Sequence, residues 1–284
     1  MDIVRAYVDD EIVDKHLLGE GAPPEWFQKG GYLRDFVVLF WIQIVGAYLL
    51  YFFFTTTSYY IFFVWFKDTF NPTYKYNGKE IRNEIVTSCK AVPWLAIMTA
   101  PLWMIDEKLT YKNVADYGVG YLLFSVVWFL VFTDFLIYWF HRWLHYPPLY
   151  RVLHATHHSF VSITPFASHA FHPVDGYIQA LPYHLFVLFF PMHNITQFCL
   201  FIFVNFWTIS IHDRVRMERG GVINGAAHHT LHHRYFKCNY GQYFTLWDRV
   251  GNTYLEPGDK PSWSYKTLKE EAHRRNGFAQ DKQD

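Results

Sequence analysis

The sequence is poor in cysteine and carries no net charge. Its three cysteines, Cys89, Cys199 and Cys238, are scattered and form no CxxC pair, so we expect no disulfide framework. The 25 Lys and Arg residues balance the 25 Asp and Glu residues, and bulk charge therefore gives no reason to expect a nucleic-acid ligand. Residues 1–30 are acidic and lack an apolar run, so we expect no cleaved secretory signal of the usual pattern.

Apolar residues are abundant, and they are gathered into long uncharged runs. Hydrophobic residues make up 51% of the chain and aromatic residues 21%. Uncharged runs occupy 36–66, 119–133 and 195–211. A run of about 18 or more uncharged residues is a candidate membrane span. The sequence therefore predicts an all-α integral membrane protein with about four to five transmembrane helices and a cytosolic, histidine-rich, metal-binding cap.

The apolar pattern also predicts how the chain is divided. We expect a poorly ordered N-terminal segment over 1–32, a membrane domain with its cap over 33–258, and a C-terminal tail over 259–284. Within the domain the expected elements are a long helix at 33–66, a charged loop at 67–90, a short apolar segment at 91–105 broken by Pro93 and Pro101, a helix at 119–140, and a hairpin at 177–212 that turns near 189–194.

The basic residues predict the orientation in the membrane. Loop 67–90 contains five Lys and Arg residues, whereas loop 106–118 contains only two. Cytoplasmic loops carry the excess of Lys and Arg. Segments 67–90, 141–176 and 213–284 are therefore expected in the cytosol, and the N-terminus in the lumen.

Fourteen of the 16 histidines lie between positions 141 and 233, and their spacing is regular. "HRWLH" places two imidazoles at i and i+4 on one helix face, and "HATHH" and "HTLHH" each place three at i, i+3 and i+4. The histidines of these motifs are His141 and His145, then His154, His157 and His158, then His229, His232 and His233.

A histidine taken alone is usually a surface residue or a satisfied core residue, but that interpretation does not explain three clustered motifs. Crowded imidazoles repel one another once protonated, unless a metal holds them neutral. At least eight imidazoles without a thiolate pair exceed the four ligands of one zinc ion, so two metals are expected. Imidazole suits iron, zinc and copper alike. A lipid-embedded substrate favours an oxygen-activating iron pair, since hydrolytic two-zinc sites usually include carboxylates.

The histidine segments resemble the membrane fatty acid hydroxylase/sterol desaturase superfamily, and the sequence between the motifs resembles that of its sterol C5-desaturases. The resemblance covers about 33–258. It is carried by "DFLIYWFHRWLHYPPLYRVLHATHHSFVSITPFASHAFHPVDG" at 134–176 and "HHTLHHRYFKCNYGQYFTLWDRVGNTY" at 228–254. It implies that the eight motif histidines are ligands of a di-iron centre.

The resemblance implies further ligands and supporting residues. His212 matches a ligand that lies before the third motif. Related hydroxylases carry HxxxH there, but this chain reads "TISIH", with Thr208 in the place of the first histidine. His172, in "HPVDG", is the candidate replacement. His169 and His228 are expected beside the ligands, and Asp134, Asp175 and Asp248 are carboxylates that can accept a hydrogen bond from ligand imidazoles.

The resemblance also implies a reaction. O2 and two electrons, delivered from NAD(P)H through cytochrome b5 and its reductase, remove two hydrogens from a Δ7-sterol at C5–C6, and a Δ5,7-sterol results. Two iron ions, replaceable by zinc on purification, would act at the cytosolic face of the endoplasmic reticulum membrane. Ser162, Thr164 and Ser168 are candidates to meet the sterol hydroxyl or the active oxygen. Candidates to dock an acidic cytochrome are Arg142, Arg216, Arg234 and Lys237.

Two kinds of alternative remain open from sequence. The first is another enzyme of the superfamily, a sterol C4-methyl oxidase or a fatty acyl or lipid hydroxylase, which would gain oxygen instead of losing hydrogen. The second is a non-catalytic metal- or haem-binding membrane protein. The absence of CxxCH and the retention of every histidine motif argue against that second class.

Overall fold

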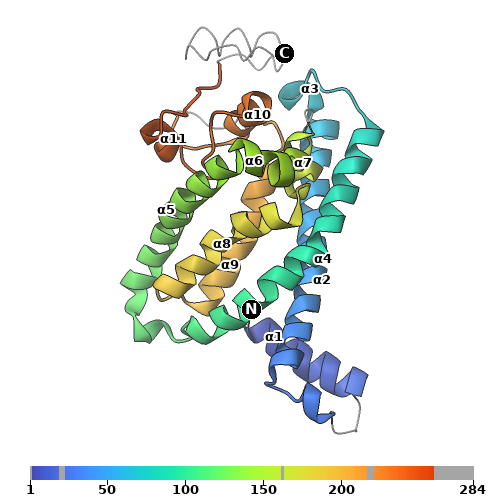
Figure 1. Ribbon diagram of the computed structural model, residues 1–284, viewed down its shortest axis with the longest axis vertical. Coiled ribbons are helices and arrows are strands. Elements are labelled where there is room, and N and C mark those ends of the chain that lie inside the picture. The colour runs from blue at the N-terminus through green and yellow to red at the C-terminus, as the bar shows by residue number, and fades with distance from the viewer. Residues whose placement is uncertain (1, 19–22, 161–162, 216–220, 259–284) are drawn as a thin grey trace.

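A computed structural model of the chain describes residues 2–18, 23–160, 163–215 and 221–258 (Figure 1). Within these ranges the structure is helical, and the only strand-like features are two isolated bridges, Tyr111 with His193 and Ile223 with Phe244. The prediction of an all-α membrane protein is confirmed. The predicted tail, 259–284, lies outside the described residues.

Three of the described helices are long and apolar enough to cross a membrane. The first is α2 (Tyr32–Tyr59), which continues without a break into η3 (Tyr60–Trp65). The second is α4 (Gly78–Leu109) and the third is α5 (Gly118–Leu144). The predicted helices at 33–66 and 119–140 are therefore confirmed, with α5 extended by one turn so that it carries His141 into the cap.

The prediction of a loop over 67–90 and a short segment over 91–105 is wrong. After α3 (Lys67–Phe70), the chain enters α4 at Gly78, where the Asn77 side chain accepts the Glu80 N–H at 3.3 Å as an N-cap. The helix then runs for 32 residues through both Pro93 and Pro101. Proline usually breaks helices in soluble proteins, but membrane helices tolerate it because neighbouring groups satisfy the freed carbonyls.

The predicted hairpin consists of α8 (Pro173–Phe189) and α9 (Asn194–Ser210), and it turns at 190–193. Each helix has 17 residues, about 26 Å at 1.5 Å per residue, slightly less than the ~30 Å hydrocarbon core. The hairpin packs between α4 and α5 (Figure 1), around a core that includes Phe129, Phe186 and Leu200.

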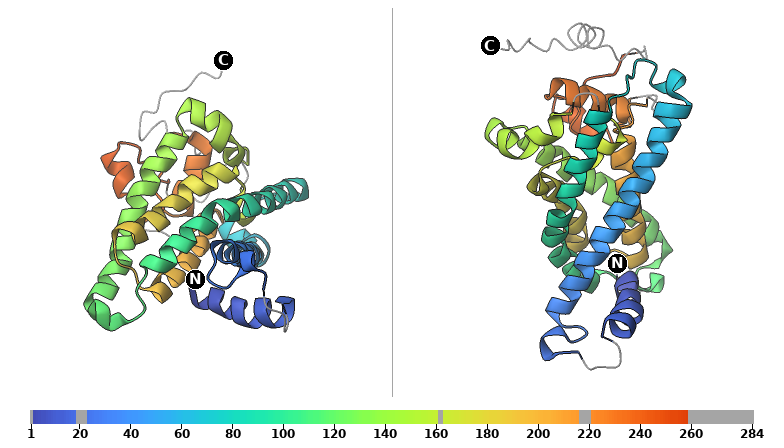
Figure 2. Two further views of the ribbon diagram at one scale, coloured as in Figure 1. Left: turned by 60° about the horizontal axis from the view of Figure 1, so that its bottom comes forward. Right: turned by 90° about the vertical axis from the view of Figure 1, so that its right-hand side faces the viewer.

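The N-terminal segment, expected to be poorly ordered, is helical over α1 (Asp2–Tyr7) and η1 (Val8–Leu18). Ion pairs fix it. The fully buried Arg34 guanidinium donates to Asp9 at 2.9 Å and to Asp14 at 2.5 Å, and Arg5 donates to Glu107 at 2.7 Å. These charged residues pair across α1, η1, α2 and α4. Helices α1 and η1 lie at the lower end of the bundle (Figure 2).

The short elements after α5 gather at the opposite end of the bundle (Figure 1). They form a cap, defined here as α6 (Pro147–Leu149), η5 (Tyr150–His154), α7 (Ala155–His158), α10 (Ala226–Tyr235) and α11 (Leu246–Val250) with their connections. Below it, η6 (Pro165–His169) is tied to the long helices, because the Tyr51 and Ser88 hydroxyls both donate to the Phe166 carbonyl. Two short helices, η2 (Glu25–Phe27) and η4 (Val114–Asp116), complete the connections.

Candidate metal centre

Nine buried or half-buried histidines of the cap fall into two groups, within each of which the ligand nitrogens all lie within 4.8 Å of one another. The first group contains His141, His145, His154, His158 and His232. The second group contains His157, His212, His229 and His233. Nε2 atoms converge: those of His158 and His232 are 3.1 Å apart in the first group, and those of His212 and His229 are 3.0 Å apart in the second.

The two HxxHH motifs divide their histidines reciprocally between the groups. In the motif of η5 and α7, the i and i+4 histidines, His154 and His158, join the first group, while His157 joins the second. In α10, His229 and His233 join the second group, while His232 joins the first. At about 100° per residue, i+3 lies about 60° to one side of i and i+4 about 40° to the other side, so one helix face can direct its histidines toward two adjacent centres. Each motif thus links both groups, which sequence alone did not show.

The hydrogen bonds of four imidazoles determine which ring nitrogen is free. The Nδ1 atom of His141 lies 3.0 Å from the Tyr240 carbonyl oxygen, and that of His154 lies 2.7 Å from the Asp175 carboxylate. Because these oxygens only accept, each Nδ1 carries the hydrogen and each Nε2 carries a lone pair. The His212 and His232 Nδ1 atoms are fixed likewise by the carbonyls of Thr208 at 2.6 Å and Cys238 at 2.8 Å.

Two such lone pairs face each other without a hydrogen between them. The Nε2 atoms of His141 and His154 are 3.2 Å apart, although both rings carry their hydrogen on Nδ1. Lone pairs at that distance repel unless a cation lies among them. Neutral imidazole Nε2 is also the commonest protein ligand of transition metals. The residues present therefore fit a metal ion in each group. Five convergent nitrogens in the first group leave no place for a porphyrin plane, which argues against haem.

Local backbone features place the acceptors. Helix α10 ends at Tyr235. The next residue, Phe236, has a φ of 63° in the left-handed region, and the chain turns back so that the Cys238 carbonyl meets His232. The Asp248 carboxylate accepts the backbone N–H groups of Tyr240 and Gly241 at 2.8 and 2.9 Å. Asp248 therefore acts on His141 through the Tyr240 carbonyl, and it contacts none of the nine histidines directly.

The structure sorts the other predicted site residues. Asp175 lies against His154, as expected, and its second oxygen accepts from Gln179 at 2.7 Å. Asp134 does not reach an imidazole, because it accepts the backbone N–H groups of residues 242–244. His172 belongs to neither group, since it is the N-cap of α8 and its Nδ1 accepts the Val174 N–H at 3.3 Å. The nine grouped histidines are the remainder of the ten predicted ligands.

His169 and His228 also stay outside both groups. His228 packs against Tyr254, whereas His169 contacts Ser168 and Asn205. Thr164 does not line the cavity described below, because its hydroxyl and its N–H both bond to the buried Glu84. The sequence did not predict that Glu84 is buried, because it appears there only as an acidic residue before an apolar run. Ser162 and Arg216 lie outside the described residues.

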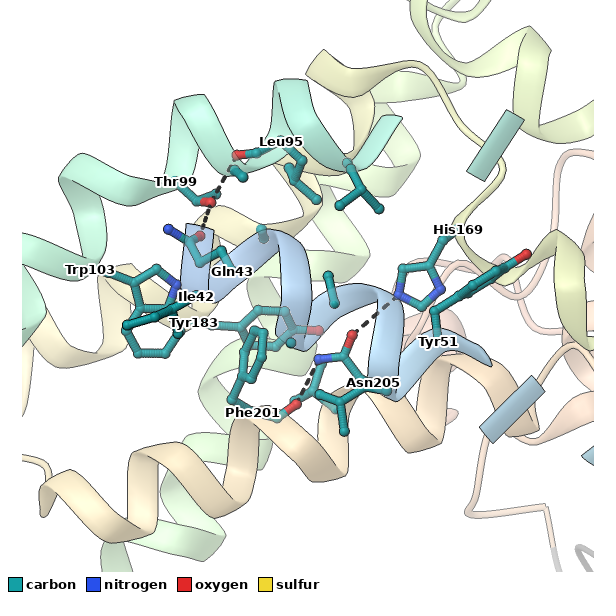
Figure 3. A pocket seen from close by; sticks show the side chains of 18 of the residues that line it. Ile42, Gln43, Tyr51, Leu95, Thr99, Trp103, His169, Tyr183, Phe201 and Asn205 are labelled. Carbon is teal, nitrogen blue, oxygen red and sulfur yellow. Dashed lines mark hydrogen bonds between the residues drawn. The ribbon is translucent and has the colours of Figure 1, made fainter. Parts of the chain in front are cut away.

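A cavity of about 930 Å³ leads from the histidines into the bundle. Its lining includes His157, His212 and His229 of the second group but only His141 of the first. Most of the remaining lining is apolar and comes from α2, α4, α8 and α9, with α1 and η1 at the far end. Figure 3 shows part of this cavity. Its volume lies at the upper end of the range of small-molecule sites, about 300–1,000 Å³.

Acidification is expected to destabilise the metal-free cap. Burial, together with neighbouring imidazoles, holds the pKa values of His157, His158, His229, His232 and His233 well below 6.5. The unfolded chain takes up protons at about pH 6.5, so below that pH it binds more protons than the folded state and the free energy of unfolding falls. The thermal unfolding midpoint of chelated protein in detergent should be flat from about pH 8 to 7 and should drop between about pH 6.5 and 5. A midpoint unchanged at pH 5 would contradict neutral, buried imidazoles.

Comparison with known proteins gives consistent matches. The sequence model of the fatty acid hydroxylase family matches residues 126–253. The chain is 45% identical over 252 residues to Delta(7)-sterol 5(6)-desaturase of Eremothecium gossypii, covering 86% of this chain and 69% of that protein. It is 42% identical to human lathosterol oxidase, with 95% of each chain covered, and 43% identical to the Candida albicans Delta(7)-sterol 5(6)-desaturase, of which it spans 60%. No solved structure matches the chain.

Proposed function

The chain belongs to the fatty acid hydroxylase family, alongside the Delta(7)-sterol 5(6)-desaturases and lathosterol oxidases, and from this premise we propose that it desaturates a Δ7-sterol at C5–C6. The observation that carries the proposal is the junction of the cavity with the second histidine group. A long apolar cavity that ends on metal-binding imidazoles suits a hydrophobic rod whose reacting C–H bonds are unactivated.

The proposed cofactor is a pair of iron ions, one in each histidine group. Opposed Nε2 lone pairs support a cation in the first group, and the matching convergence of Nε2 atoms supports one in the second. When bound, the irons supply the O2 activation that breaks an unactivated C–H bond, which no acid–base side chain can do. Zinc can take the place of iron on purification, because imidazole sites bind it more tightly than ferrous iron.

In the proposed reaction, one O2 takes up two hydrogens from C5 and C6 of the sterol, together with two electrons and two protons, and yields two water molecules and a Δ5,7-sterol. The donor of the electrons is proposed to be cytochrome b5, reduced from NAD(P)H by its reductase. The exposed Arg151 on η5 lies next to the histidine groups and suits an acidic carrier better than Arg142, whose guanidinium is bonded to Tyr138 and to the Gly251 carbonyl.

The protein's own residues orient the metal-binding imidazoles and exclude water from the reacting carbons. The carbonyls of Tyr240, Cys238 and Thr208 and the Asp175 carboxylate hold the Nδ1 hydrogens, and so keep each Nε2 free toward the group's centre. The apolar lining excludes bulk water from the reacting carbons. Because three of four second-group histidines line the cavity but only one of five first-group histidines does, the substrate is expected to approach from the second group.

The proposed setting is the endoplasmic reticulum membrane, with the cap in the cytosol. Helix α3, helices α6 and α7, and helices α10 and α11 lie at the same end of the bundle (Figure 1), so one choice of side fixes all of them. The basic residues of the cap end support the cytosolic side.

Sterol profiling tests the proposed function. The chain is expressed in cells that lack their own C5-desaturase and accumulate Δ7-sterols. Δ5,7-sterols are expected to appear, two mass units lighter than their precursors. Persistence of Δ7-sterols beside inserted protein would overturn the proposal, and oxygenated methyl sterols or hydroxylated lipids, heavier by one oxygen, would identify an oxidase or hydroxylase of the same family instead.

A further inference from the structure

Two hydrogen-bonded clusters of polar side chains line the part of the cavity shown in Figure 3. One is the chain Ser168–His169–Asn205, next to the histidine groups. The other is the pair Gln43–Thr99, in which Thr99 Oγ1 lies 2.6 Å from Gln43 Oε1. A sterol carries one polar group, the hydroxyl on C3, so these clusters make different predictions for the direction in which the sterol lies.

The hydrogen bonds of the first cluster have a fixed direction. Asn205 Nδ2 donates to the Phe201 carbonyl at 2.8 Å, which turns Asn205 Oδ1 toward His169 Nε2, 3.2 Å away. His169 therefore carries its hydrogen on Nε2, and its Nδ1 accepts from the Ser168 hydroxyl at 3.0 Å. Burial lowers the pKa of His169 to about 4, so the imidazole is neutral and this assignment holds at neutral pH.

Once these bonds are made, the cluster still offers one donor and one acceptor. The Ser168 oxygen retains lone pairs after its hydrogen is donated to His169. Asn205 Nδ2 has a second hydrogen beyond the one donated to the Phe201 carbonyl, and the bond to His169 does not use it. The two groups lie at opposite nitrogens of the His169 ring, so a single hydroxyl meets only one of them. We infer that the Asn205 N–H donates to the C3 hydroxyl of the sterol, that Ser168 and His169 are positioning residues that hold the Asn205 amide in this orientation, and that this contact sets the direction of the substrate in the cavity.

The location of the cluster agrees with the chemistry of the reaction, and in this respect the inference rests on the proposed function. C3 and C5 are separated by a single ring carbon, so the hydroxyl must lie close to the metals when C5 and C6 are oxidised. His169 lines the same cavity as His157 and His212, and its ring contacts Tyr51 edge-on.

The Gln43–Thr99 pair lies too far along the cavity for this role. Gln43 precedes Tyr51 by eight residues on α2, about 12 Å at 1.5 Å per residue. With the hydroxyl at Asn205, the sterol side chain extends past Gln43 toward η1, where Val8, Ile12 and Leu17 line the cavity.

The test is a binding measurement on metal-loaded protein held without O2, so that no turnover occurs. Affinities are measured for a Δ7-sterol and for the same sterol lacking the C3 hydroxyl, by displacement of a radiolabelled Δ7-sterol. Wild-type protein is expected to prefer the alcohol by about tenfold or more. Asn205→Leu and, with a smaller change of volume, Ser168→Ala are expected to bring the ratio toward one. Gln43→Leu is the matched control in the same cavity and is expected to keep the preference.

The outcomes separate this inference from the proposed function. Equal binding of both sterols by wild-type protein, or no binding of either, would overturn it. So would a preference that survives Asn205→Leu and Ser168→Ala. Its loss in Gln43→Leu, or in Thr208→Val, which removes the neighbouring Thr208–Gln242 pair, would place the hydroxyl at that site instead. A hydroxyl preference lost only in the Ser168 and Asn205 variants would support the inference, even where the loaded protein makes no Δ5,7-sterol on exposure to O2 and an electron donor.

Discussion

Replacing His154 or His157 with alanine is expected to remove a different metal ion in each variant and to abolish desaturation in both. His154 belongs to the first group and His157 to the second, although they are three residues apart. Metal content, measured by mass spectrometry on purified protein, should fall from about two ions per chain to about one. Product formation should fall by well over 100-fold, since loss of a supporting residue alone costs about 10- to 100-fold.

His172→Ala is the matched control, because it removes an imidazole at the cap that belongs to neither group. It should keep both ions and most activity, with a loss of stability of about 1 kcal/mol or less from the α8 N-cap. Loss of a metal ion in His172→Ala, or two ions retained in His157→Ala, would contradict the division into two groups.

Asp175→Asn is expected to lower metal affinity and activity by about 10- to 100-fold, through the tautomer of His154. Gln179 Nε2 donates to Asp175 Oδ1 at 2.7 Å, so the oxygen of an asparagine would stay on that side. Its Nδ2 would then face His154 Nδ1, which could no longer donate there. The imidazole would carry its hydrogen on Nε2 and lose the lone pair that a metal needs.

A second substitution tests this explanation. In Asp175→Asn with Gln179→Glu, the new carboxylate accepts from the asparagine amide and turns the asparagine oxygen back toward His154. Metal content and activity should then recover in part. A double variant no better than the single one would show that the negative charge at position 175, and not the direction of the hydrogen bond, is what His154 requires.

Much of the site could be predicted because the regular spacing of its histidines is visible in the sequence. The i, i+3 and i+4 histidines of 154–158 and 229–233 lie on helices and nine of ten predicted ligands come together. The division into two groups could not be predicted, because it depends on how η5, α7 and α10 face one another. The Nδ1 acceptors at Tyr240, Cys238 and Thr208 are backbone carbonyls, which every residue has and which therefore leave no signature in the sequence.

The fold was predictable where hydrophobicity decides it and was missed where context does. The run at 36–66 predicted α2 and its extension η3, because no soluble environment suits so many uncharged residues. The second long helix, α4, was missed because it contains Pro93 and Pro101. The free-energy cost of a proline in a helix depends on whether neighbouring groups satisfy the freed carbonyls, which the sequence does not show. The order of the N-terminal segment depends on partners distant in sequence, such as Arg34 for Asp9 and Glu107 for Arg5.

The reciprocal division of the HxxHH motifs has a consequence for how the protein is made. Each group draws on α10, the first through His232 and the second through His229 and His233. Neither group is therefore complete until the ribosome has passed codon 233, by which time α2, α4, α5 and the α8–α9 hairpin have all been synthesised. Helix α10 closes both groups at once, so the two sites mature together, in a step that follows synthesis of the membrane bundle.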